Sequence, residues 1–324
     1  MTRSGGRKVS AGTVVKWALV VAAVVFLVIA LRNEWPEVRE AIREVPVWAL
    51  VAALVSAMAA VAVSGAQQRS LLLTLGVPRV PRRPWFRVFF AAQLGKYLPG
   101  SAWAYVAQME LSRQLGVRRA VSVVTILLGA GITVLQAFVF GAVLIGQPSL
   151  DAVPVWAQVV LAVLAVLALV VVLARPRLVT SALGLLPKRV RKDRFGDIEV
   201  GSLAMPAVWS AVAWVAYGLH FWFLVLPFVD EPAQSLRLAL GGFPLAWAIG
   251  FLVFFVPAGV GVREVVLAAA LAPVLGTGVA LTVATLSRFV IIVAEALLAA
   301  SAPFLGGRRA ASEDLSPAEG AAAG

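Results

Sequence analysis

Six ionisable side chains interrupt long apolar runs of this sequence, and they have the greatest capacity for chemistry. They are Lys96, Glu110, Arg263, Glu264, Arg288 and Glu295. An ionisable group at membrane depth is costly and is a candidate functional residue by default. Arg288 and Glu295 are two helical turns apart and would lie on one helix face. Two interpretations follow: the charges lock helices together as intramembrane ion pairs, or they line a polar cavity for an anionic substrate.

The sequence offers few residues for breaking bonds. It has no cysteine and a single histidine, which excludes disulfides, thiolate nucleophiles, cysteine-based metal sites and sites with several histidines. It contains no nucleotide-binding loop, metal-ligand cluster or spaced pair of carboxylates. We therefore predict no catalytic residue, no metal and no cofactor, and we expect a protein that is not an enzyme. His220 lies beside Phe221 and Trp222, which favours a hydrogen-bonded or interfacial histidine over a catalytic one.

The composition is that of a polytopic membrane protein. Of the 324 residues, 61% are hydrophobic and 14% are charged, and the mean hydropathy is +0.94. Soluble domains are about 45–50% apolar and about 25% charged. A membrane-spanning helix needs about 20 apolar residues. Uninterrupted runs of this kind cover 14–31, 47–66, 120–146, 155–174, 203–228 and 277–300. The run at 14–31 is too long for a signal peptide, so we interpret it as an uncleaved first helix.

Two further apolar regions, 85–115 and 238–276, are interrupted by proline, glycine and charge. The first contains Lys96-Tyr97-Leu98-Pro99-Gly100-Ser101-Ala102-Trp103, and the second contains Pro257-Ala258-Gly259-Val260-Gly261-Val262-Arg263-Glu264. Proline ends helices, and irregular backbone at membrane depth must be surrounded by protein or by a water-filled cavity. Each region is therefore predicted to form a re-entrant hairpin or a pair of half-helices.

The predicted half-helices favour an anionic ligand. New helices would begin near Ser101 and Gly259, and helix N-termini present N–H groups that suit phosphate. Lys96, Arg263 and Arg288 add three cations to the same regions. The alternative role of the glycines is close packing of helices.

The order of these elements repeats along the chain. Each half reads helix, helix, broken hairpin, helix, over 14–146 and over 155–300, and the second half starts from the opposite side of the membrane. The predicted fold is therefore an all-α polytopic membrane protein. It has about six full transmembrane helices and two broken or re-entrant hairpins, arranged as an inverted-topology repeat. A single transmembrane domain would cover 14–300, between an N-terminal tail at 1–13 and a disordered C-terminal tail at 301–324.

The positions of the cations predict the orientation. The net charge is +12, and its Lys and Arg residues gather before 14, at 76–87, at 113–119, at 175–194 and at 308–309. By the positive-inside rule these segments face the cytoplasm. Both termini are then cytoplasmic in a multi-pass protein of the cell (plasma) membrane. The excess charge serves orientation beside anionic lipid headgroups, so no nucleic-acid partner is predicted.

The sequence resembles the lysylphosphatidylglycerol synthase transmembrane-region family, also called flippase-like domain proteins. The resemblance is carried by Gly95-Lys96-Tyr97-Leu98-Pro99-Gly100, by the second broken motif from Pro257 to Glu264, and by Leu286-Ser287-Arg288. It covers about 14–300 and implies a membrane domain that moves aminoacylated or other polar lipids between leaflets. With no soluble domain after Gly306, the chain resembles the stand-alone members, which would not themselves synthesise a lipid.

The first functional hypothesis is a lipid translocase that moves a polar, anionic or lipid-linked headgroup between leaflets, with membrane lipids as its partners. The alternatives are a membrane scaffold for a separate lipid-modifying or glycosyl-transferring enzyme, and a solute transporter. Under the first hypothesis the headgroup cleft would be lined by Lys96, Tyr97, Pro99, Gly100, Ser101, Trp103, Pro257, Gly259, Gly261, Arg263, Glu264, Arg288 and Glu295.

Overall fold

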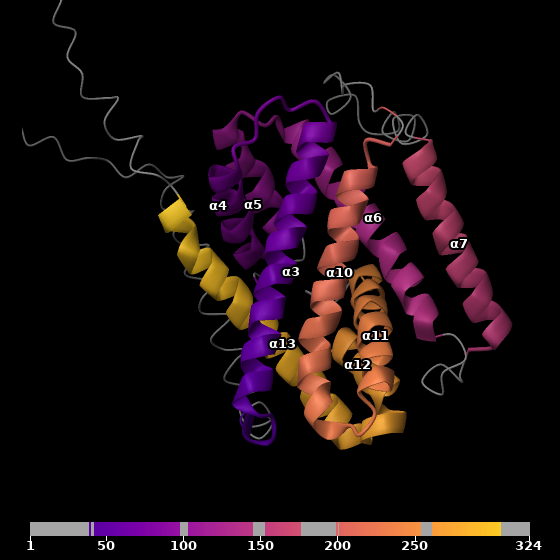
Figure 1. Cartoon of the computed structure of the whole chain (residues 1–324). Coiled ribbons are helices and arrows are strands. Elements are labelled where there is room, and N and C mark those ends of the chain that lie inside the picture. Colours follow the sequence, from indigo (N-terminus) through magenta and orange to yellow (C-terminus); the bar gives the residue numbers. More distant parts are fainter. Residues whose placement is uncertain are drawn as a thin grey trace, which may run out of the picture.

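A computed structural model of the protein describes residues 39, 42–97, 103–144, 153–175, 199, 201–253 and 261–305. Within these ranges the chain is helical and contains no strand (Figure 1), which confirms the predicted all-α class. The helices are α3 (Val47–Thr74), α4 (Arg82–Gln93), the 3-10 turn η1 (Leu94–Tyr97), α5 (Trp103–Ser112), α6 (Arg119–Gly141), α7 (Val155–Ala174), α10 (Ala204–Val225), α11 (Pro232–Leu252), α12 (Val262–Leu275) and α13 (Thr277–Ser301).

Several of the described helices are long and apolar enough to cross a membrane, so the protein is a multi-pass membrane protein. These six segments are Val47–Thr74, Arg119–Leu144, Val155–Ala174, Ala204–Phe228, Pro232–Leu252 and Thr277–Leu305. All but one of them overlap an uninterrupted apolar run predicted as a span. The predicted first helix at 14–31 lies outside the described residues.

The exception is α11, because the sequence assigned 238–276 to a broken hairpin. The helix continues without interruption through Gly241 and Pro244. A Cβ at Gly241 would lie 2.6 Å from a side-chain carbon of Val143, so this glycine allows close helix packing. A helix buried among other helices also accommodates an internal proline. The break predicted at Pro257 lies outside the described residues.

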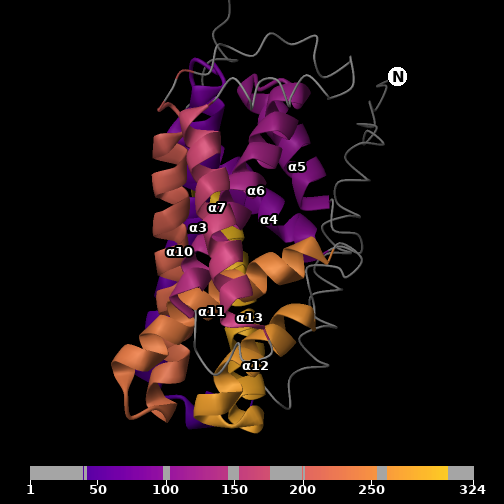
Figure 2. The same cartoon turned by 90° about the vertical axis from the view of Figure 1, so that its right-hand side faces the viewer.

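Two pairs of helices occupy opposite ends of the bundle. We call α4, η1 and α5 the first helix pair, and α11 and α12 the second helix pair. The first lies toward the upper end and the second toward the lower end in both views (Figures 1 and 2). With 12 and 10 residues, α4 and α5 are about 18 and about 15 Å long, which is too short for a hydrocarbon core of about 30 Å. This agrees with the half-helices predicted in 85–115.

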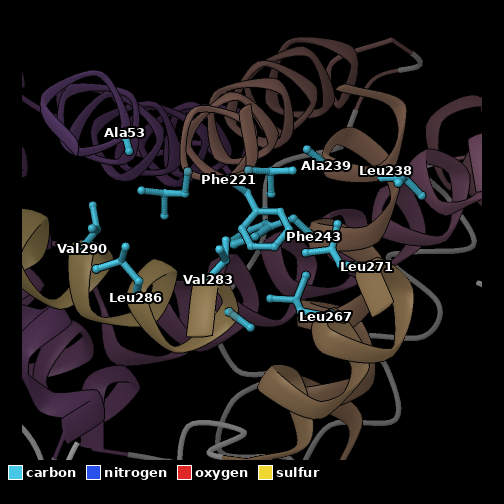
Figure 3. Packing of buried hydrophobic residues seen from close by; sticks show 14 of the residues in the cluster. Ala53, Phe221, Leu238, Ala239, Phe243, Leu267, Leu271, Val283, Leu286 and Val290 are labelled. Carbon is cyan, nitrogen blue, oxygen red and sulfur yellow. The ribbon is translucent and has the colours of Figure 1, made fainter. Parts of the chain in front are cut away.

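A hydrophobic core joins α3, α10, α11, α12 and α13. Phe243 of α11 is fully buried in it, with Phe221 of α10, Leu267 and Leu271 of α12, and Val283 of α13 around it (Figure 3). In a membrane, such close packing holds helices together where the exclusion of water cannot. The core therefore fixes the second helix pair against α13.

α7 lies at the edge of the bundle beside α6 (Figure 1). Only Gln158 and Ala165 of this helix are buried, whereas Leu161, Leu164 and Leu167 are each more than half exposed. A helix with apolar side chains exposed on most of its surface is stable in lipid and not in water. Its exposure is the direct physical sign of a membrane environment.

Exposed arginines are unequally divided between the two ends of the described chain. The end at which α4 and α6 begin and α7 terminates carries Arg79, Arg82, Arg83, Arg113, Arg118, Arg119 and Arg175. The opposite end carries Arg39, Arg43 and Arg237. This unequal distribution of arginines matches the clustering of cations in the sequence from which the orientation was predicted. The cytoplasmic position of the arginine-rich end stays a prediction.

Candidate functional site

α13 contacts both helix pairs. It starts at the lower end of the bundle beside α12 and runs diagonally toward α4 (Figure 1). Its residues Arg288 and Glu295 are about 10 Å apart along the helix axis. Each of them forms an ion pair with a different helix pair. We call the group formed by these residues and their neighbours the charged cluster; it consists of Lys96, Arg263, Glu264, Arg288 and Glu295.

Glu295 connects α13 to the first helix pair. Its Oε1 accepts a charged hydrogen bond from Nζ of Lys96, and its Oε2 accepts a hydrogen bond of 2.6 Å from the hydroxyl of Tyr97. Both donors belong to η1, the turn that follows α4. The side chain of Glu295 is 1% exposed, whereas that of Lys96 is 32% exposed. A carboxylate buried this deeply depends on such partners, because an unpaired buried charge is strongly destabilising.

Glu264 connects α13 to the second helix pair. Its Oε2 accepts a hydrogen bond of 2.7 Å from the backbone N–H of Gly261, and its Oε1 lies 3.6 Å from Nε of Arg288. Gly261 precedes α12 with φ of +82°, a left-handed conformation that glycine adopts without strain. The carboxylate therefore caps the positive end of α12 and attaches that end to α13.

Arg263 has a buried guanidinium nitrogen with unused hydrogen-bonding capacity. Its guanidinium carbon lies 4.3 Å from the centroid of the Phe243 ring, which is cation–π geometry. Its Nη2 is buried and has no hydrogen-bond partner among the described residues. Buried polar atoms are nearly always bonded, so an unsatisfied one indicates a role or an absent partner such as water or an ion. Three cations and two carboxylates leave the cluster with one excess positive charge.

A buried histidine fixes α13 against α3 and α10. His220 is fully buried; its Nδ1 lies 3.3 Å from the carbonyl oxygen of Ala53, and its Nε2 lies 2.9 Å from the hydroxyl of Ser287. A carbonyl only accepts, so Nδ1 carries the hydrogen and Nε2 accepts from the serine. This confirms the hydrogen-bonded histidine preferred from sequence. This bridge fixes the position of Ser287, which is the residue immediately before Arg288.

Gly95 allows η1 to approach α5 closely. A Cβ at this position would lie 2.8 Å from both the backbone nitrogen and the Cα of Ala104. Because backbone atoms cannot yield as a flexible side chain can, any larger residue would push η1 away from the first turn of α5. Lys96 and Tyr97 follow directly, so the glycine helps to determine where both side chains lie.

Comparison with known protein families assigns the chain to one of them. The family model described as the lysylphosphatidylglycerol synthase TM region matches residues 15–299, which is nearly the whole sequence. The chain belongs to this family. The match confirms the resemblance drawn from the motifs, and it makes the chain a membrane protein of a family related to lipid handling. The comparisons with curated proteins and with solved structures gave no match.

In this lysylphosphatidylglycerol synthase TM-region protein, part of the predicted site lies within the described structure. The charged cluster comes together around α13, with Tyr97 and Gly261 in direct contact with its carboxylates. Trp103, the first residue of α5, is 40% exposed. The remaining predicted residues, Pro99, Gly100, Ser101, Pro257 and Gly259, lie outside the described residues. The cleft itself therefore stays a prediction.

Of the backbone N–H groups at the starts of the predicted half-helices, only part lies within the described structure. Those near Ser101 and Gly259 lie outside the described residues. The N–H of Gly261, at the start of α12, is already bonded to the carboxylate of Glu264. An anion near this helix end would therefore meet a carboxylate before the N–H, and a side-chain cation is the better contact.

Glu110 belongs to the arginine-rich end and not to the charged cluster. The sequence placed it among the charges at membrane depth, but its side chain is 41% exposed near the end of α5. Its carboxylate lies 2.7 Å from Nε of Arg119 and 3.2 Å from Nη1 of Arg113. The hydrogen bonds from Arg119 lower the pKa of Glu110. This is an exposed ion-pair group, for which a small contribution to stability is expected.

Two site contacts were not anticipated from the sequence. One is the ring of Phe243 beneath Arg263, and the other is the hydrogen bond from Ser287 to His220. Phe243 lies in an apolar stretch, where its type gives no sign of a cationic neighbour. Ser287 does stand beside Arg288 in a motif that carries the family resemblance, so its position was the available signal.

Proposed function

We propose that the protein is a lipid translocase of the cell membrane that moves a polar headgroup containing a phosphodiester between the two leaflets. The proposal rests on membership of a family related to lipid handling and on a charged cluster at the meeting point of two helix pairs. It assigns no bond-making or bond-breaking step to the chain. The arginine-rich end would face the cytoplasm.

The single observation that carries the proposal is the unsatisfied Nη2 in the guanidinium of Arg263. Lys96 and Arg288 face carboxylates, whereas Nη2 of Arg263 is buried without a hydrogen-bond partner among the described residues. The excess positive charge of the cluster matches the single negative charge of a phosphodiester. A planar guanidinium binds phosphate oxygens with paired hydrogen bonds, and it is therefore suited to this ligand.

The physical task of a translocase is to lower the cost of taking a headgroup through hydrocarbon. A charged group without partners in an apolar medium faces a prohibitive loss of solvation. The side-chain cations between the helix pairs would replace part of that hydration, while the acyl chains remain in the bilayer. The opposite placement of the two pairs supports the inverted-topology repeat that we propose for this chain.

A scaffold for a separate lipid-modifying or glycosyl-transferring enzyme is the second candidate. The observation that favours it is the mutual pairing of Lys96 with Glu295 and of Arg288 with Glu264, which also suits a purely structural lock. The two functions differ in what they require of Arg263. A scaffold requires only that the protein folds and binds its partner enzyme. A translocase also requires the positive charge of Arg263, because that charge binds the headgroup.

The lipid that co-purifies with the full-length protein tests the proposal. We expect mass spectrometry to find one class of phosphodiester lipid enriched relative to the surrounding membrane. Arg263→Ala should lose most of this enrichment, because it removes the unsatisfied guanidinium. Arg113→Ala, which removes an exposed arginine outside the cluster, is the matched control and should retain it. A bound lipid mixture identical to that of the membrane in all three proteins would refute specific headgroup binding.

A further inference from the structure

We propose that Glu295 takes up a proton when an anionic phosphodiester headgroup replaces it at Lys96, so that headgroup binding and protonation occur together. The proposal rests on the proposed function and adds to it a residue that couples transport to protons. The step makes one O–H bond at the carboxylate of Glu295 and breaks one bond to hydrogen in the buffer acid that supplies the proton, and the headgroup oxygen takes the place of the carboxylate beside Nζ of Lys96.

The two sides of this ion pair differ in their accessibility. Glu295 is 1% exposed and packed within the bundle, whereas the side chain of Lys96 is 32% exposed. A ligand can therefore contact Lys96 without displacing α13. The ligand and Glu295 would then compete for the same ammonium group, because both present an anionic oxygen.

Displacement of Glu295 creates a charge problem that a proton solves. A buried carboxylate that loses its cationic partner is strongly destabilised, and such groups become neutral in preference to remaining charged. Arg288 lies two helical turns from Glu295, and its Nε is 3.6 Å from Oε1 of Glu264. When the anion enters as the carboxylate takes up a proton, the ammonium group of Lys96 keeps one anionic partner and Glu295 is not left as an unpaired buried charge.

Tyr97 allows Glu295 to remain bonded in both states. Its hydroxyl now donates to Oε2 of Glu295 at 2.6 Å. A hydroxyl donates one hydrogen bond and also accepts, so it can accept from the protonated carboxyl after the exchange. The neutral carboxyl would thus keep a partner at the position it already occupies.

Glu264 is not equivalent to Glu295. It is held by the backbone N–H of Gly261 as well as by Arg288, and its charge caps α12. Losing that charge would remove the helix cap, whereas Glu295 caps no helix. The structure therefore assigns the exchangeable carboxylate to α13 near the first helix pair.

Other charged and titratable groups act on the carboxyl of Glu295 from several elements. They are Lys96 and Tyr97 of η1, Tyr217 of α10, and Arg263 of α12, while Arg288 lies two turns away on α13 itself. Lys96, Arg263 and Arg288 supply the positive charge of the cluster around this carboxyl while no anion is bound. An incoming phosphodiester opposes them, so its arrival favours proton uptake at this position.

The test is calorimetric binding of short-chain phosphatidylglycerol to the full-length protein in detergent, in buffers of different ionisation enthalpy. This phosphodiester stays singly charged between about pH 6 and about pH 8. Any proton taken up on binding is therefore taken up by the protein and not by the lipid. We expect about one proton bound per lipid, and an affinity that weakens by up to about tenfold per pH unit as the pH rises.

Glu295→Gln should imitate the protonated state. We expect it to bind the lipid without proton uptake, with no pH dependence, and at about pH 8 at least as tightly as the unaltered protein. Glu110→Gln, at an exposed carboxylate outside the cluster, should keep the proton uptake. If Glu295→Gln does not fold, the proton count of the unaltered protein decides the matter alone.

The outcomes separate this inference from the proposed function. Lipid binding without proton uptake overturns the inference and leaves the translocase standing. Absence of lipid binding at both pH values overturns both. Dimethyl phosphate, a phosphodiester without acyl chains, should bind far more weakly than the lipid. Equal binding of dimethyl phosphate with equal proton uptake would identify a free anion as the ligand and overturn the lipid assignment.

Discussion

Replacing Arg263 with alanine should slow the movement of an anionic lipid across vesicle membranes by about 10- to 100-fold, the range expected for losing a hydrogen bond to a charged group. The guanidinium is the cation of the cluster that retains an unsatisfied buried nitrogen among the described residues. Its removal also eliminates the excess positive charge of the cluster. The measurement is the rate at which labelled lipid in the inner leaflet becomes accessible to an external quencher.

Two variants control this experiment. Arg263→Lys keeps the charge but not the planar pair of donors, so we expect it to be intermediate in rate. Arg113→Ala removes an exposed arginine of the arginine-rich end and should leave the rate unchanged. If Arg263→Ala folds normally and moves lipid as fast as the unaltered protein, the cation has no part in transport and the scaffold function is favoured.

Reversing one charge of the Lys96–Glu295 pair should destabilise the protein substantially. Lys96→Glu would set a second carboxylate against a residue that is 1% exposed. Breaking a buried pair costs about 3–5 kcal/mol, and we expect about 2–3 kcal/mol here because Lys96 is partly exposed. The apparent melting temperature in detergent, followed by tryptophan fluorescence, should fall by about 3–5 °C.

The double reversal distinguishes a specific pair from general intolerance of charge. Adding Glu295→Lys to Lys96→Glu restores opposite charges across the same contact, so at least half of the lost melting temperature should return. Glu110→Lys, a reversal at an exposed carboxylate beside arginines, should cost about 1 kcal/mol or less. Failure of the double variant to recover any stability would show that α13 and η1 are not joined by this pair.

Long apolar runs made several helices predictable from the sequence. The runs at 120–146, 155–174 and 277–300 correspond to α6, α7 and α13, because an unbroken apolar segment of this length has one stable form in lipid. α11 was predicted as part of a broken hairpin and not as a full span, for a physical reason. Gly241 and Pro244 are helix breakers in water, but tight packing against neighbouring helices tolerates both within a transmembrane helix.

The charged residues were predictable, but their partners were not. Lys96 and Glu295 are 199 residues apart in the chain, so their contact depends on how α4 and α13 pack. The sequence suggested that Arg288 and Glu295 share a helix face, and it did not show that each binds a different helix pair. The described structure contains the ion pairs of the first interpretation, whereas the polar cavity of the second stays a prediction, for which the unsatisfied Nη2 of Arg263 is the supporting observation.

The most direct test of the central claim is lipid movement by the purified protein in otherwise protein-free vesicles. Vesicles would carry a trace of fluorescent phosphatidylglycerol, phosphatidylcholine or a lipid-linked sugar, and a membrane-impermeant reductant would bleach the outer leaflet. We predict that the protein makes the inner-leaflet share of at least one phosphodiester lipid accessible, beyond the plateau seen in empty vesicles. Identical plateaus and rates with and without protein, for every lipid, would contradict a translocase.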